Sequence, residues 1–314
     1  MKQLVLAADL GGTNLRVAAV YDDGQILYRA RRETPQTDRA HEIVSAISEA
    51  AKECLANAEN VKVFAAAVPA IIDFEKGIPL RLPNIPALNN FHLAEALGNK
   101  LSLRCILEND ANAAAIGENW LGASRDFKNS ILVTLGTGIG GGIIIDRKIY
   151  RGADGTAGEI GHICVEPLGA PCGCGSRGCV EQYASATAIV RMARELQNRF
   201  PETELSKRAD FSASDIYESG KIGDKLALEV FRLQGFYLGI VLADLINIFN
   251  PEAFIIGGGA AAGWDLFIPE TKKQIQQRAY REPAMRAKLI RAELGDDAGI
   301  LGAARVGFDL RTNL

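Results

Sequence analysis

Short apolar runs, separated by glycine or acidic turns, occupy the first seventy residues of the chain. These runs predict strands over residues 3–8, 15–20 and 25–30, the last two joined by a hairpin turn at 22–24. Apolar residues then recur at helical spacing over 43–54, and an apolar run at 62–67 predicts another strand. The pattern predicts a strand meander that leads into alternating helices and strands.

The same design returns in the second half. Residues 129–150 place a strand, a glycine and threonine turn and a strand in series, so the turn at Asp9–Thr13 has a counterpart at Gly136–Gly142. Between the copies, a strand ending near Glu108 runs into an alanine-rich helix. Residues 225–249 predict a long buried helix that Asn250 and Pro251 end, followed by a strand.

This repetition predicts an α/β chain with an internal duplication and two lobes. We expect a small lobe over residues 1–110 and a larger lobe over 111–299, with a terminal helix over 300–314 that packs back on the first lobe.

Charge and composition exclude several classes of protein. The 314 residues include 35 basic and 38 acidic side chains, a formal net charge of −3, and neither sign forms a block that would favour nucleic acid or membrane binding. The longest apolar run, residues 236–249, contains Asp244 and is too short to cross a bilayer. The first residues do not read as a leader, so we expect a cytoplasmic protein, a compartment in which clustered cysteines favour metal over disulfides.

Glycine turns supply the candidate phosphate sites. Glycine lets backbone N–H groups approach a phosphate, and Thr13 and Thr137 add hydroxyl donors to the two matched turns. Either turn alone is equally consistent with an empty hairpin. A third turn, Gly257, Gly258 and Gly259, can close over an adenine or simply join a strand to a helix.

Two common nucleotide motifs do not explain these glycines. Gly136, Gly138 and Gly141 match the dinucleotide fingerprint, but three isoleucines follow where a helix is required. A Walker loop is absent from the sequence, because no glycine-rich run is followed by Lys and Ser or Thr.

Three acidic or amide side chains have the chemistry of phosphoryl transfer. Asp9, at the end of the first strand, is placed to reach a hydrated Mg²⁺, or else caps a turn. Asn109 and Asp110 lie at a strand-to-helix junction and suit a hydroxyl binder and a general base. The plain alternative is that Asp110 caps a helix starting at Ala111.

The segment Gly161–Gln182 holds four of the six cysteines. Cys172, Cys174 and Cys179, with His162 upstream, can supply a closed tetrahedral set for a structural Zn²⁺. Spacing alone leaves Cys164 as a competing fourth ligand and free or redox thiols as a weaker alternative.

Six motifs in this order, DLGGTNLR, ENDANAAAIGE, LGTGIGGGIII, GEIGH, CGCGSRGCVEQYAS and IIGGG, resemble the ROK family of sugar kinases and repressors. They run from Asp9 to Gly259, and among members the similarity is greatest to bacterial glucokinases. The resemblance implies a two-lobed actin/hexokinase-like ATPase fold, built from duplicated ribonuclease H-like domains. It also implies ATP-dependent phosphorylation of a hexose 6-hydroxyl, with glucose as the leading substrate, and a homodimer or homotetramer.

The resemblance further implies roles for individual residues. Asp110 would be the general base. Sugar hydroxyls would be bound by Asn84, Asn109, Glu159, His162 and Glu181. The ATP phosphates would contact Gly11, Gly12, Thr13, Thr137 and Gly138, and the zinc ligands would be His162, Cys172, Cys174 and Cys179.

One departure bears on the substrate. Ala67 and Ala70 flank Val68 and Pro69 where the family often has a glycine-flanked proline loop near the sugar, which predicts a tighter pocket. Kinases for N-acetylmannosamine, N-acetylglucosamine, fructose or allose are alternatives, as is a sugar sensor without turnover. A DNA-binding repressor is disfavoured, because only eight residues precede Asp9.

Overall fold

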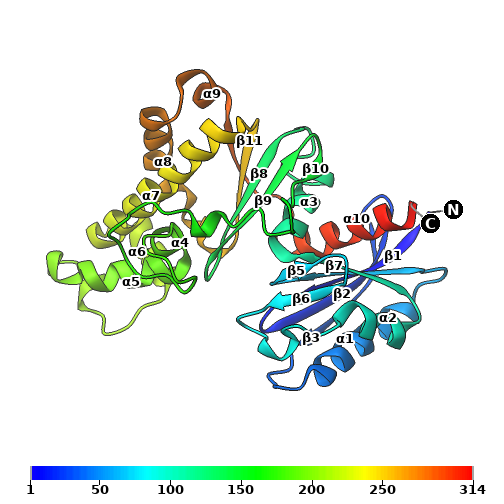
Figure 1. Cartoon of the computed structure of the whole chain (residues 1–314). Helices are drawn as coiled ribbons and strands as arrows, with labels where there is room; N and C mark the ends of the chain where they lie inside the picture. Colours follow the sequence, from blue (N-terminus) through cyan, green and yellow to red (C-terminus); the bar gives the residue numbers. More distant parts are fainter. Residues whose placement is uncertain (1, 313–314) are drawn as a thin grey trace. The chain divides into compact units, whose positions relative to one another are not determined.

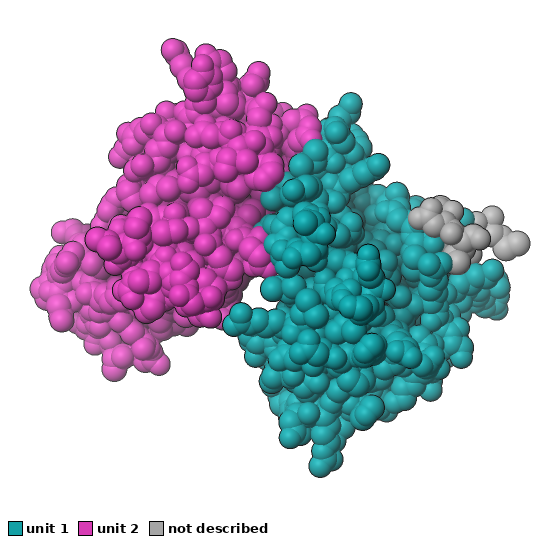
Figure 2. Space-filling view, viewed as in Figure 1, with its two compact units in different colours: residues 1–128, 142–158, 292–314 teal, residues 129–141, 159–291 magenta. Residues whose placement is uncertain are grey.

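The structure, a computed structural model, describes residues 2–312, with side chains through Leu310. The chain divides into two compact units (Figure 2). Unit 1 comprises residues 1–128, 142–158 and 292–314, and unit 2 comprises residues 129–141 and 159–291.

Unit 1 is built on a five-stranded sheet of order β3-β2-β1-β4-β7. β1, β2 and β3 form the predicted antiparallel meander, and β4 and β7 continue the sheet in parallel. The strands are β1 (Leu4–Leu10), β2 (Asn14–Tyr21), β3 (Ile26–Glu33), β4 (Val63–Val68) and β7 (Arg104–Asn109), with a separate pair, β5 (Ile71–Asp73) and β6 (Ile78–Arg81). The strands predicted over residues 3–8, 15–20 and 25–30 are confirmed.

Helices cover both faces of this sheet (Figure 1). Alternate residues of β1 point to opposite sides: Leu6 packs with α1 (Ala40–Leu55) and α2 (Leu93–Leu101), whereas Val5 packs with α10 (Ala298–Thr312). α3 (Asp110–Trp120) lies against α10. Two short 3-10 helices complete the unit, η1 (Pro86–Leu88) and η6 (Gly295–Asp297).

The second sheet has the order β10-β9-β8-β11-β12. Its strands are β8 (Ser130–Leu135), β9 (Ile139–Ile145), β10 (Lys148–Ile149), β11 (Ala253–Gly257) and β12 (Lys288–Arg291). As in the first sheet, an antiparallel hairpin is followed by parallel strands. The repeated strand, glycine turn and strand are therefore confirmed in the second sheet.

Helices make up most of unit 2. They are α4 (Glu181–Ala184), α5 (Ala186–Leu196), α6 (Ala213–Lys221), α7 (Lys225–Phe249), α8 (Trp264–Arg278) and α9 (Arg281–Arg286), with 3-10 turns η2 (Ile160–His162), η3 (Gln197–Arg199), η4 (Leu205–Lys207) and η5 (Gly259–Gly263). α7 packs closely on α8, because a Cβ on Gly235 would lie 2.3 Å from the Phe267 carbonyl oxygen.

The long helix α7 ends where the sequence predicts. Asn250 adopts φ +44° there, and its N–H bonds the Ile246 carbonyl. The apolar run identified in the sequence, residues 236–249, is too short to cross a membrane. The whole helix α7 is long and apolar enough to do so by length and composition alone. However, 61% of its most apolar window is buried inside the structure, as expected of a core helix.

Candidate active site

The first glycine turn lies in unit 1 between β1 and β2. The Gly11 N–H donates to the Asn14 carbonyl at 2.8 Å, and the Thr34 hydroxyl donates to the Gly11 carbonyl at 2.7 Å. A Cβ on Gly12 would lie 3.1 Å from the Asn84 Cβ, so Asn84 rests against this turn. The structure thus brings together two predicted site residues, Gly12 and Asn84, that are 72 positions apart in sequence.

Asp9 precedes this turn and is largely buried. Burial raises the pKa of its carboxyl, and the Arg16 guanidinium, with Nη1 3.7 Å from Oδ2, opposes that rise. A Cβ on Gly299 of α10 would lie 3.1 Å from the Asp9 Cγ. A divalent cation nearby would favour the ionised carboxylate.

Asn109 and Asp110 occupy the junction of β7 and α3. Asn109 is the N-cap: its Oδ1 accepts from the Asn112 N–H at 3.0 Å, and its Nδ2 donates to the Ala70 carbonyl at 3.2 Å. The alternative in which Asp110 caps a helix starting at Ala111 is therefore wrong, since Asp110 is already the first helical residue. Its Oδ1 accepts from the Ala111 N–H at 2.9 Å.

Glu108 is a site residue that the sequence did not single out. Its side chain is 1% exposed, and Oε1 accepts from the Asn109 N–H at 3.1 Å and from the Asn112 Nδ2 at 3.2 Å. Oε2 accepts from Arg151 Nε at 3.1 Å and Nη2 at 2.5 Å. The Arg151 guanidinium also lies over the Phe74 ring, 5.3 Å from its centroid. This ion pair, in which Glu108 is buried and Arg151 is partly exposed, supports the backbone beside Asn109 and Asp110.

Two further glycine turns lie in unit 2. In the turn between β8 and β9 the Gly136 N–H donates to the Gly138 carbonyl at 2.9 Å, and the Thr137 side chain is exposed. β9, not a helix, follows this turn, so the dinucleotide fingerprint is accidental.

The turn Gly257–Gly259 follows β11, which pairs with β8. Gly258 has φ +85°, and a Cβ there would lie 2.5 Å from the Leu135 carbonyl oxygen. The two turns of unit 2 are therefore neighbours, and the second leads into η5.

The cysteine segment of unit 2 brings four donor atoms together. Those of His162, Cys172, Cys174 and Cys179 all lie within 4.8 Å of one another. His162 Nδ1 is 3.6 Å from Cys172 Sγ, and the sulfurs of Cys174 and Cys179 are 3.7 Å apart. Hydrogen bonds from the Ser176 backbone N–H and from the Cys172 side chain lower the pKa of the Cys174 thiol. Three sulfurs and one imidazole fit the donor set of a structural zinc site.

Cys164, the competing ligand left open by spacing, is exposed and is not a member of this group. It forms an isolated backbone bridge with Cys179 instead.

Glu159 and Glu181 flank this cluster. Glu159 is 52% exposed and its Oε2 lies 3.8 Å from His162 Nε2. Glu181 Oε2 accepts from the Ile139 N–H at 3.0 Å, and its Oε1 is 4.0 Å from Cys172 Sγ. The Glu181 carboxylate therefore reaches both the second glycine turn and the cysteine cluster.

Each of the two sheets contains a strand, a glycine turn and a second strand, and the fold matches solved sugar kinase structures over nearly the whole chain. The protein therefore has an actin/hexokinase-like ATPase fold. The ROK family model matches residues 5–307 of this chain. The chain belongs to the ROK family.

Within the family, the chain is similar to both sugar kinases and repressors. The glucokinase of Thermotoga maritima is 37% identical over 312 residues, covering 97% of each chain. A solved ROK family glucokinase from Streptomyces griseus, in complex with glucose and AMPPNP, is 35% identical with a TM-score of 0.82, covering 98% of this chain and 100% of that one. The xylose repressor of Bacillus subtilis is 32% identical over 242 residues, covering 77% of this chain and 60% of the repressor.

Proposed function

We propose that the protein is a glucokinase, which transfers the γ-phosphoryl group of ATP to the 6-hydroxyl of glucose. The observation that carries this is similarity over nearly the whole chain to glucokinases, one of them solved with glucose and an ATP analogue. We also propose that it acts in the cytoplasm as a homodimer or homotetramer.

Asp110 is the proposed general base. An ionised carboxylate accepts the hydroxyl proton as the new O–P bond forms, and the N-cap position holds Asn109 beside it for a hydroxyl contact. Glu108 is the positioning residue, because it bonds the Asn109 N–H. Asn84 is proposed as a further sugar contact from unit 1.

Unit 2 contributes its own groups. Glu159, His162 and Glu181 are proposed to bind sugar hydroxyls. His162 turns Nδ1 toward the cysteine sulfurs, which leaves Nε2 for a hydroxyl. The same four-donor group is proposed to hold a structural Zn²⁺, which would fix the segment carrying both glutamates.

The glycine turns are the proposed nucleotide contacts. Gly11, Gly12 and Thr13 of unit 1, and Thr137 and Gly138 of unit 2, offer N–H and hydroxyl donors to the phosphates. Gly257, Gly258 and Gly259 offer a surface free of side chains to the adenine. Mg²⁺, when bound near Asp9, would neutralise charge on the phosphates.

A coupled assay of ATP turnover over a panel of hexoses tests this proposal. We expect the highest kcat/KM with glucose, against N-acetylmannosamine, N-acetylglucosamine, fructose and allose. Asp110→Asn should lower kcat at least about 100-fold, the usual contribution of a general base, while retaining glucose binding. The matched control Asp210→Asn, at a carboxylate 82% exposed in unit 2, should leave kcat unchanged.

Two outcomes would overturn the proposal. Glucose binding without turnover of any hexose would identify a sugar sensor, a role for which the repressor relatives give a precedent. Full activity of Asp110→Asn would remove the base assignment.

A further inference from the structure

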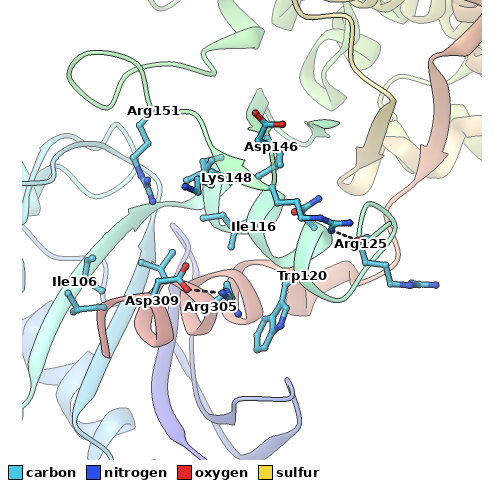
Figure 3. A pocket seen from close by; sticks show the side chains of 15 residues that line it. Ile106, Ile116, Trp120, Arg125, Asp146, Lys148, Arg151, Arg305 and Asp309 are labelled. Atoms are coloured by element: carbon cyan, nitrogen blue, oxygen red, sulfur yellow. Dashed lines mark hydrogen bonds and ion pairs between the residues drawn. The ribbon is translucent and has the colours of Figure 1, made fainter. Parts of the chain in front are cut away.

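A cavity of about 860 Å³ lies within unit 1, bordered by β7, α3, the hairpin of β9 and β10, and α10 (Figure 3). Among the described residues that line it, none is proposed above to contact hexose, ATP or metal. Its volume falls in the range of about 300–1,000 Å³ found for small-molecule sites. The cavity has the size for a separate, metabolite-sized ligand.

The lining combines apolar and cationic side chains. Ile106, Ile116 and Trp120 contribute apolar surface from β7 and α3, and further apolar residues come from β9 and α10. Five basic side chains also line the cavity, against two acidic ones, Asp146 and Asp309; the basic residues are Arg125, Arg147, Lys148, Arg151 and Arg305. A cavity lined by apolar side chains and by an excess of positive charge suits an anion that carries an apolar body.

Three of the five cations are already paired with carboxylates. Arg151 binds Glu108 at 2.5 Å, Arg305 binds Asp309 at 2.9 Å, and Arg125 binds Glu293 at 2.7 Å.

The other two cations, Arg147 and Lys148, are not paired with a carboxylate among the described residues. Arg147 Nη1 donates to the Arg125 carbonyl, a neutral acceptor, at 2.7 Å. Within the part of the chain that the structure describes, neither Arg147 nor Lys148 forms an ion pair. Two positive charges at the cavity are therefore available to a ligand.

The turn that carries Arg147 has an unfavourable backbone conformation. Asp146 and Arg147 form the turn between β9 and β10 with φ of +48° and +63°. Glycine is the residue that normally occupies such a position, and arginine is uncommon there. This turn brings an arginine and the lysine directly after it into the lining of the cavity. Figure 3 shows Lys148 and Arg151 on the side facing α10, which carries Arg305 and Asp309.

We propose that this cavity binds a small organic phosphate or carboxylate with an apolar body. Arg147 and Lys148 hold the anionic group, and the apolar residues of α3 and β7 contact the body. The Arg151 guanidinium at the same cavity also binds Glu108, which accepts from the Asn109 N–H, so the side chains of Arg151 and Glu108 would connect a ligand here to the proposed sugar-binding residues.

Isothermal titration with phenyl phosphate and with benzoate tests the site and separates the two kinds of anion. Saturating glucose and Mg-AMPPNP are present throughout to fill the proposed active site. At least one of the two anions should bind with one site per chain, and inorganic phosphate should bind more weakly because it lacks the apolar body. Binding is measured without turnover, so the result does not depend on the glucokinase proposal.

The variant Arg147→Gly with Lys148→Ser removes both available cations. Glycine suits φ +63°, so the turn is retained, and a circular dichroism spectrum checks the fold. We expect affinity to fall about tenfold or more, as the loss of two ionic contacts implies. The control Lys52→Ser with Lys62→Ser removes two exposed lysines outside the cavity and should leave affinity unchanged.

Three results would overturn the proposal. They are failure of both anions to bind at millimolar concentration, equal affinity of the double variant and the wild type, and equal affinity of inorganic phosphate and the aromatic anions.

Discussion

Removing the cation of the buried pair between Glu108 and Arg151 should destabilise unit 1 measurably. The Glu108 side chain is 1% exposed, and besides Arg151 its carboxylate has only the Asn109 N–H and the Asn112 amide as donors. In Arg151→Gln these two donors would remain. The carboxylate loses two hydrogen bonds from a guanidinium, at 3.1 Å and 2.5 Å.

The expected loss follows from this geometry. Removing one partner of a fully buried ion pair costs about 3–5 kcal/mol. The Arg151 side chain is 36% exposed, so water screens part of the interaction, and we expect about 2–3 kcal/mol for Arg151→Gln. Glu108→Gln leaves an arginine that can reach water, and should cost about 1–2 kcal/mol.

A double-mutant cycle measures the interaction itself. The double variant should be more stable than the sum of the single losses predicts, by a coupling of about 1–2 kcal/mol. Unfolding by urea, followed by tryptophan fluorescence in a Trp264→Phe background, reports unit 1, because Trp120 is then the one remaining tryptophan. Arg39→Gln, at an ion pair of unit 1 whose side chains are 75% and 49% exposed, is the control and should cost about 0.5 kcal/mol or less.

Two results would refute this reasoning. One is a loss for Arg151→Gln no greater than that of the control, and the other is strict additivity of the two substitutions.

Further predictions concern packing, thiols and metal. Gly302→Ala should cost about 3 kcal/mol in urea unfolding, because its Cβ would lie 1.6 Å from a backbone oxygen of α3, whereas Gly259→Ala, with no atom within 4 Å, should cost little. Burial raises the pKa of Cys54 to about 11 and of Cys105 to about 12. Both thiols therefore stay protonated at pH 8, so iodoacetamide should label the exposed Cys164 and spare Cys54 and Cys105. Equal labelling rates of the three cysteines, measured by mass spectrometry, would contradict this. Elemental analysis should find about one zinc per chain; chelation that leaves the three clustered cysteines unreactive would count against the site.

The fold was predictable where a pattern is local. Short apolar runs bounded by turn residues located the meander of β1, β2 and β3, and Asn250 with Pro251 located the end of α7. Short elements such as β5, β6 and β12 carry too few residues for a period to be recognised. Family resemblance, not periodicity, predicted the actin/hexokinase-like class, which the solved relatives confirm.

The candidate site was predictable as a set of residues, but its supporting contacts were not. Asn109 and Asp110 stand out by chemistry, yet which of them caps α3 depends on backbone angles that the sequence does not display. Glu108 and Arg151 are 43 positions apart and meet only because β7 and the segment after β10 fold together. The assigned roles of the site residues stay predictions until the variants above are measured.

The contact between Gly138 and Glu181 bears on how glycine-rich turns are interpreted. A Cβ at position 138 would lie 2.2 Å from the Glu181 Oε2. A side chain at this position would displace the Glu181 carboxylate from the Ile139 N–H, to which it bonds at 3.0 Å, whether or not a phosphate ever approaches. In a randomised library, larger residues at 138 should be enriched together with a shorter side chain at 181, so the two positions would covary although they lie 43 positions apart.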